Sequence, residues 1–95
     1  MNLEKLREER HRIIQIARQY GACNIRLFGS IVQGKADGES DVDFLVEMAP
    51  DRSLLERIAL KQALEDLLSC QVDLVSDKSL HWYVRDKILN EAVPL

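Results

Sequence analysis

The strongest constraint on the fold is the segment from Asp41 to Glu47, in which apolar residues alternate with mostly acidic ones. Val42, Phe44 and Val46 fall on one side of an extended chain, and Asp41, Asp43 and Leu45 fall on the other. Successive side chains of a β-strand point to opposite faces. The pattern therefore predicts a strand with one buried face and one face that carries carboxylates.

Two further strands and three helical segments are predicted around this strand. Residues 24–28 alternate like a half-buried strand, and residues 71–75 form a short third strand. Apolar residues at helical spacing predict helices over residues 3–20, 53–68 and 79–92. Gly21 is a stop for the first helix, and Ser53-Leu54-Leu55-Glu56 has the capping-box form that begins the second. We expect an α+β fold, a small mixed β-sheet with helices packed on one face.

Length and composition are those of one globular domain, so residues 1–95 are treated as a single unit. Hydrophobic residues make up 46% of the chain and charged residues 31%, which is an ordinary balance for a soluble domain. The formal net charge of -3 disfavours broad nucleic-acid binding, which requires a basic surface. Cys23 and Cys70 are far apart and in no metal-ligand spacing, so we expect a reduced cytoplasmic protein. No apolar run approaches the length of a membrane span.

Three groups of residues are candidates for phosphate and metal chemistry. Gly29-Ser30 follows the first predicted strand, Asp41 and Asp43 open the second, and Asp73 lies in the third. Asp41 and Asp43 point to the same face about 7 Å apart, and Asp73 can add a third carboxylate. Mg²⁺ takes carboxylate and phosphate oxygens as ligands, and two such ions can clamp a phosphoryl displacement. Gly29 allows close approach to a phosphate, and Ser30 stands where a short helix begins, so both are expected to bind nucleotide phosphates.

Each group also has an ordinary structural explanation. An Asp-x-Asp at the start of a strand is usually solvent-exposed, and Gly-Ser after a strand is usually a turn. Residues 29–35 also match the start of a P-loop, but Ala36 stands where Mg²⁺ binding needs Ser or Thr. A polar loop from Lys35 to Ser40 is predicted there instead of a long helix. We favour the carboxylate interpretation because the three groups agree in topology.

Together the motifs resemble the signature of the minimal nucleotidyltransferases of the DNA polymerase β superfamily. The matching residues are Gly29-Ser30, Gly34 and Ser40-Asp41-Val42-Asp43-Phe44-Leu45-Val46, extended by Asp73 and residues 84–93. The resemblance implies a polymerase β-like nucleotidyltransferase fold in which Asp41, Asp43 and Asp73 hold two Mg²⁺ ions. It also implies that Gly29 and Ser30 grip the β- and γ-phosphates of ATP or another NTP, and that Asp73 helps to deprotonate the acceptor hydroxyl.

Members of this family resemble antitoxins that are paired with helical HEPN-domain ribonuclease toxins. The resemblance implies transfer of AMP from ATP to a hydroxyl of the toxin, and the intact carboxylates favour this enzymatic interpretation. One alternative is a non-catalytic antitoxin that masks its partner sterically. A further alternative is a small-molecule transferase, although such enzymes usually carry a second domain for the acceptor. The nucleobase, the acceptor and the oligomeric state are left open.

Overall fold

The computed structural model describes residues 2–34 and 41–95, so the loop predicted from Lys35 to Ser40 lies outside the described residues. Its elements, in chain order, are α1 (Leu3–Glu8), α2 (Arg10–Gln19), β1 (Ala22–Phe28), the 3₁₀ turn η1 (Gly29–Ile31), β2 (Val42–Met48), α3 (Leu54–Leu68), β3 (Val72–Ser76), the 3₁₀ turn η2 (Asp77–Ser79), α4 (Trp82–Glu91) and β4 (Val93–Pro94). The three predicted strands are confirmed, with bounds that move by one or two residues.

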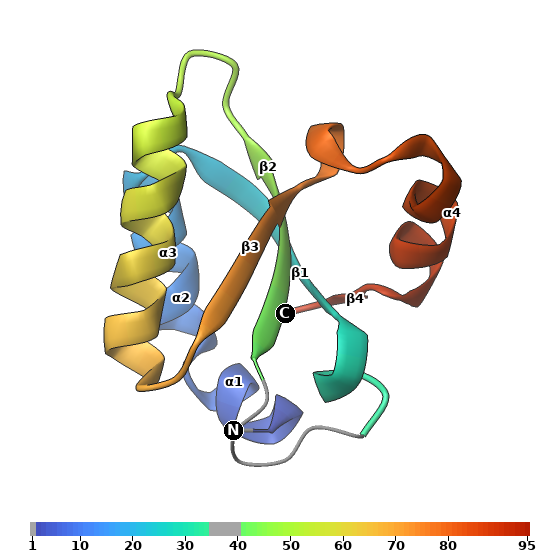
Figure 1. Cartoon of the computed structure of the whole chain (residues 1–95). Coiled ribbons are helices and arrows are strands. Elements are labelled where there is room, and N and C mark those ends of the chain that lie inside the picture. The colour runs from blue at the N-terminus through green and yellow to red at the C-terminus, as the bar shows by residue number, and fades with distance from the viewer. Residues whose placement is uncertain (1, 35–40) are drawn as a thin grey trace.

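The strands form one mixed sheet, as the alternating segments predicted. The order is β3-β2-β1-β4, with β2 parallel to β3 and antiparallel to β1, and β4 antiparallel to β1. Figure 1 shows α2 and α3 together on one face of the sheet and α4 on the opposite side. The predicted α+β fold with a small mixed sheet is confirmed. α2 and α3 pack on one face as expected, whereas the predicted C-terminal helix, α4, lies on the opposite side.

The core lies between the sheet and the α2–α3 layer. Val42 and Phe44 are 0% exposed and Val46 is 1% exposed, which confirms the apolar face predicted for β2. They pack into one cluster with the buried side chains of α2 and α3, which are Ile13, Ala17, Leu60, Leu64 and Leu68. Leu45, on the opposite face, is also fully buried, although it is not part of this cluster. The second face of the sheet is therefore covered over part of its length.

The predicted helix over residues 3–20 is wrong in its continuity, because it is divided at Glu9 into α1 and α2. The backbone of Glu9 leaves the helical region, with φ of -93° and ψ of 9°. Between Leu6 and Ile13 the chain holds only polar residues, so no apolar side chain fixes this turn to the core. Leu6 before the break and Ile13 after it are both completely buried.

The predicted capping box at the start of α3 is wrong in its hydrogen bonds. Ser53 is the N-cap residue, but its side chain makes no capping bond. The Glu56 carboxylate accepts a hydrogen bond of 2.6 Å from Arg52 Nη1 instead of returning to the Ser53 amide. Ion pairing with the preceding arginine therefore replaces the expected reciprocal cap.

The C-terminal helix begins later and ends earlier than the predicted range of 79–92. After α4 the chain forms β4, whose Val93 and Pro94 pair with Leu27 and Arg26. The sequence did not predict this strand, since it is two residues long and contains a proline. Proline is tolerated there because β4 lies at the edge of the sheet.

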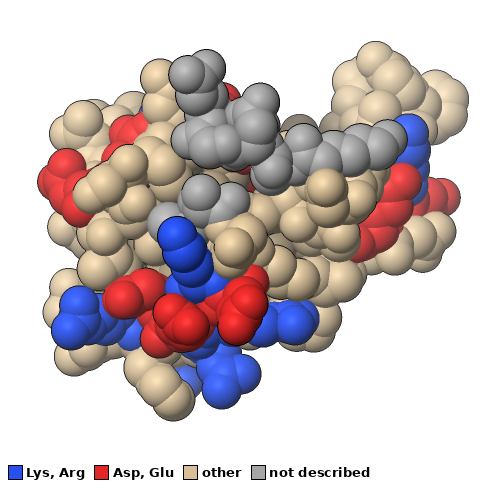
Figure 2. Space-filling model, turned by 90° about the horizontal axis from the view of Figure 1, so that it is seen from below, with Lys and Arg blue, Asp and Glu red and all other residues tan. Residues whose placement is uncertain are grey.

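Charged residues of both signs are mixed on the face that holds α1. Figure 2 views the molecule from below and shows acidic and basic side chains interleaved on that face, without a continuous basic area among the described residues. Cys23 and Cys70 are both free thiols. Among residues 2–34 and 41–95, none of the helices combines the length and the apolar character needed to cross a membrane.

Leucines of α3 give a direct test of this packing. Leu64 is 1% exposed and Leu55 is 75% exposed, although both belong to the same helix. We expect Leu64→Ala to lower the free energy of unfolding by about 2–5 kcal/mol, because it removes core contacts and leaves a cavity. The matched control Leu55→Ala should change it by about 0.5 kcal/mol or less. Urea unfolding of the two variants measures this, and equal losses would contradict the assigned orientation of α3.

Candidate functional site

Strand pairing brings the predicted site residues to one region of the sheet. Phe28, the last residue of β1, lies opposite Asp43 of β2, and Asp43 lies beside Asp73 of β3. Gly29 follows Phe28 directly, and Asp41 immediately precedes β2. The end of β1, the start of β2 and the start of β3 therefore meet at the same end of the sheet.

The carboxylates lie on the face opposite the helix-covered core. Asp43 is partly buried and stands between Val42 and Phe44, which both point into the core. Asp73 is exposed and likewise lies between two buried residues, Val72 and Leu74. Because side chains alternate along a strand, both carboxylates point away from α2 and α3. Asp41 is exposed and stands just outside the strand that was predicted to begin with it.

The charges of Asp41 and Asp73 act on the Asp43 carboxylate. The pKa of Asp43 is raised above its ordinary value of 3.8, first by burial and then by the negative charges of Asp73 and Asp41. Both causes act against the charged form, since burial removes water and like charges repel. The other two carboxylates therefore lie near enough to Asp43 to affect its ionisation.

The donor set fits a hard divalent cation. Within the described ranges, no group of three Asp, Glu, His or Cys side chains is arranged closely enough to hold a metal ion as it stands. Mg²⁺ does not need such a cage, since it keeps several waters and is commonly bound by one or two carboxylates together with substrate phosphates. A cation beside Asp43 would also offset the repulsion from its two neighbours. The residues present therefore suit metal binding that is completed by a substrate.

Gly29 and Ser30 lie in η1, a single 3₁₀ turn. The short helix expected to begin at Ser30 is this 3₁₀ turn, which begins at Gly29, and the Gly29 carbonyl accepts hydrogen bonds from the amides of Val32 and Gln33. One turn is too short to act as a helix terminus for phosphate binding. Any phosphate contact here depends on the Ser30 hydroxyl and on individual amides. Gly29 has a φ of +77°, a conformation that glycine adopts without strain.

Arg26 is a residue of this face that the sequence analysis did not single out. It lies opposite Leu45 in the sheet, and its Nη2 atom is 3.9 Å from Glu47 Oε1. The sequence could have indicated this position, because Arg26 and Phe28 are two residues apart in β1 and side chains two apart lie on the same face of a strand. Asp43 lies at the start of β2, whereas the guanidinium group of Arg26 lies nearer the end of that strand, beside Glu47.

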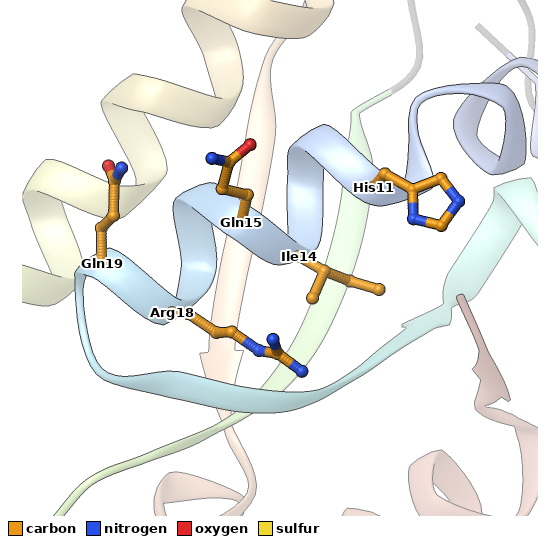
Figure 3. Close-up of a pocket in the computed structure, with 5 residues that line it drawn as sticks. All are labelled: His11, Ile14, Gln15, Arg18 and Gln19. Atoms are coloured by element: carbon orange, nitrogen blue, oxygen red, sulfur yellow. The ribbon is translucent and has the colours of Figure 1, made fainter.

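A surface groove lies elsewhere, along the outer side of α2. It has a volume of about 550 Å³ and is lined by His11, Ile14, Gln15, Arg18 and Gln19. Figure 3 shows that all five side chains come from this one helix, which packs on the face of the sheet opposite the carboxylates. No carboxylate of the described residues lines the groove, and its lining residues all belong to one helix, so it is not part of the candidate site.

The raised pKa of Asp43 predicts a stabilising substitution. Ionised Asp43 destabilises the fold, and this penalty develops as pH rises from 3.8 through the raised folded pKa. We expect Asp43→Asn to raise the melting temperature at pH 7, with a gain that disappears below the ordinary pKa. Asp66→Asn, at an exposed position of α3, is the control. Thermal unfolding at both pH values measures the effect, and a gain that persists in acid would contradict it.

Comparison with known proteins identifies the family. The profile of the nucleotidyltransferase domain matches residues 4–95. The Methanocaldococcus jannaschii protein MJ0435, named for protein adenylyltransferase activity, is 38% identical over 88 residues, which cover 93% of this chain and 95% of that protein. The protein adenylyltransferase MntA of Thermococcus cleftensis is 40% identical over 79 residues, with coverage of 83% and 80% respectively.

Solved structures agree with this assignment. A structure described as a minimal nucleotidyltransferase has a TM-score of 0.89 and 42% identity, and the match covers 100% of this chain and 97% of that one. A toxin–antitoxin complex with AMP-PNP contains a chain with a TM-score of 0.76 and 29% identity, covering 88% and 69%. Members of the matched family generally use divalent metal ions, which the three carboxylates suit. The chain belongs to the nucleotidyltransferase domain family and is a nucleotidyltransferase.

Proposed function

We propose that this protein transfers AMP from ATP to a hydroxyl of a protein acceptor, and that the acceptor is a HEPN-type toxin that is thereby neutralised. The observation that carries the proposal is the grouping of Asp41, Asp43 and Asp73 beside the Gly29-Ser30 turn. Relatives that share most of their length with this chain are named protein adenylyltransferases. A structural neighbour belongs to a toxin–antitoxin structure with AMP-PNP, an ATP analogue. We place the reaction in the cytoplasm, where ATP is available.

The proposed reaction is a displacement at the α-phosphorus of ATP. The acceptor oxygen forms a bond to this phosphorus, the bond to the bridging oxygen of pyrophosphate breaks, and the hydroxyl proton passes to Asp73. Asp73 suits this task because it is exposed and lies at the outer side of the carboxylate group, where an acceptor can approach. Ser30 and the backbone of η1 hold the β- and γ-phosphates, so that pyrophosphate leaves toward β1.

Asp41, Asp43 and Asp73 would hold two Mg²⁺ ions. Bound Mg²⁺ neutralises phosphate charge and favours in-line displacement. The protein's own contribution is to keep the partly buried Asp43 close to two further carboxylates, and burial followed by their repulsion raises the pKa of Asp43. An antitoxin that only masked its partner sterically would not need carboxylates that repel one another. The arrangement therefore supports the enzymatic function.

AMP transfer is tested with the product of the neighbouring gene as the acceptor. With ATP and Mg²⁺, we expect the wild-type protein to add one or more AMP units to it, detected by intact-protein mass spectrometry. Asp41→Asn should abolish transfer, because a neutral amide replaces a metal-binding carboxylate. The fold should survive, since Asp41 is exposed. Asp66→Asn, which also removes an exposed carboxylate, is the matched control and should leave transfer unchanged.

Two results would contradict this scheme in different ways. An acceptor that stays unmodified yet is fully inhibited by both the wild type and Asp41→Asn would show a steric antitoxin. An acceptor modified equally by both proteins would remove Asp41 from the site.

Ser30→Ala tests the nucleotide contact. We expect it to weaken ATP binding by about 1.5–3 kcal/mol, the range of a hydrogen bond to a charged group. Thermal stability should change by less than this, because the Ser30 side chain is only partly buried in a single turn. Isothermal titration calorimetry with ATP and Mg²⁺ measures the first effect and thermal unfolding the second. Lower stability with unchanged ATP affinity would make Ser30 a purely structural turn residue.

A further inference from the structure

We propose that Gly29 is a positioning residue for Asp43, because the space left by its missing side chain is where the Asp43 carboxylate lies. This inference rests on the proposed function in so far as Asp43 is taken to be a metal ligand. It gives Gly29 a role beyond that of admitting a phosphate. The close approach of Gly29 to the Asp43 carboxylate places the η1 turn directly against one of the three acidic residues.

The geometry of the contact is specific. A Cβ atom built on Gly29 would overlap Asp43 Oδ2, and it would lie 3.2 Å from Asp43 Cγ and 3.5 Å from Asp43 Cβ. Separations of 3.4–4 Å are ordinary van der Waals contacts, so only the carboxyl group is obstructed. Any residue with a side chain at this position would therefore displace the Asp43 carboxylate without disturbing its Cβ atom.

The Asp43 backbone has little freedom to yield. Its backbone is paired on both sides, with Phe28 of β1 and Asp73 of β3. The neighbouring Val42 and Phe44 are completely buried and fix the strand against the core. A carboxylate pushed away from β1 would move toward β3, where Asp73 already repels it. Loss of the space at Gly29 would thus change the carboxylate position relative to the other two acids.

The other described glycines show that positive φ alone does not explain this arrangement. Gly34 has a φ of +73°, close to the +77° of Gly29, yet a Cβ atom there would meet nothing within 4 Å. At Gly21 a Cβ atom would meet the side chain of Arg52, which is long and exposed. Among these three glycines, Gly29 alone has its Cβ space filled by a residue of the candidate site. Gly34→Ala is therefore a matched control that carries the backbone strain without the obstruction.

A double-mutant cycle in urea unfolding tests the contact independently of any activity. The proteins are the wild type, Gly29→Ala, Asp43→Ala, the double variant Gly29→Ala/Asp43→Ala, and Gly34→Ala. We expect Gly29→Ala to lower the urea midpoint more than Gly34→Ala does. In the Asp43→Ala background the effect of Gly29→Ala should shrink to that of Gly34→Ala, because the obstructed carboxyl group is absent.

Equal losses from Gly29→Ala in both backgrounds would overturn the inference, since the cost would then be backbone strain alone. Should Gly29→Ala fail to fold, recovery of folding in the double variant supports the contact. A double variant that also fails to fold, while Gly34→Ala and Asp43→Ala do fold, overturns it. Urea unfolding does not depend on activity, so these measurements remain decisive even if the wild type transfers no AMP. Failure of the proposed function can therefore be distinguished from failure of this inference.

A kinetic readout separates positioning from phosphate binding. At saturating ATP, we expect the Mg²⁺ concentration for half-maximal transfer to rise several-fold in Gly29→Ala, because its target is the metal-binding carboxylate. A higher KM for ATP with an unchanged Mg²⁺ requirement would show that Gly29 serves only the phosphates, and it would overturn the positioning role.

Discussion

The pairing of β2 on both of its sides is the constraint on which the rest of the structure depends. Its antiparallel contact with β1 sets Asp43 opposite Phe28, and its parallel contact with β3 sets Asp43 beside Asp73. The same strand supplies Val42, Phe44 and Val46 to the core. The core and the candidate site are thus two faces of one strand, and neither can be moved without the other.

Placing charges on this strand has a cost and a structural use. The raised pKa of Asp43 shows that burial and repulsion oppose its ionisation. A one-residue slip of β2 would turn Asp43 into the core and Val42 out to solvent. Burying an unpaired carboxylate costs far more than the repulsion tolerated at the surface. The Asp43 charge that destabilises the native sheet therefore disfavours the slipped alternative more strongly, so Asp43 helps to specify the register that brings it beside Asp73.

Much of this arrangement could be predicted from the sequence because it depends on a period of two residues. The alternation at 41–47 identified the buried face of β2, and the apolar-flanked Asp73 indicated a neighbouring carboxylate. The features that were missed depend on tertiary contacts. Leu45 is fully buried on the face of the sheet that carries Asp43, Glu56 pairs with Arg52 instead of capping α3, and β4 exists because α4 returns the chain to the free edge of β1. No local pattern carries that information, and the break of the first helix at Glu9 was not predicted either.

The turn after β1 shows why a glycine motif is difficult to interpret before the sheet is known. From sequence, Gly29 suggested close approach of a phosphate, and its φ of +77° is consistent with a turn residue. Strand register adds a second demand, because the residue after Phe28 faces the side chain opposite Phe28, which is Asp43. A residue without a side chain is required here for two reasons: the turn needs a positive φ, and the Asp43 carboxylate on the next strand fills the Cβ position. In a domain this small, one position serves backbone conformation and side-chain placement together, and the spacing between Gly29 and Asp43 is thereby fixed by strand register and not by the intervening loop.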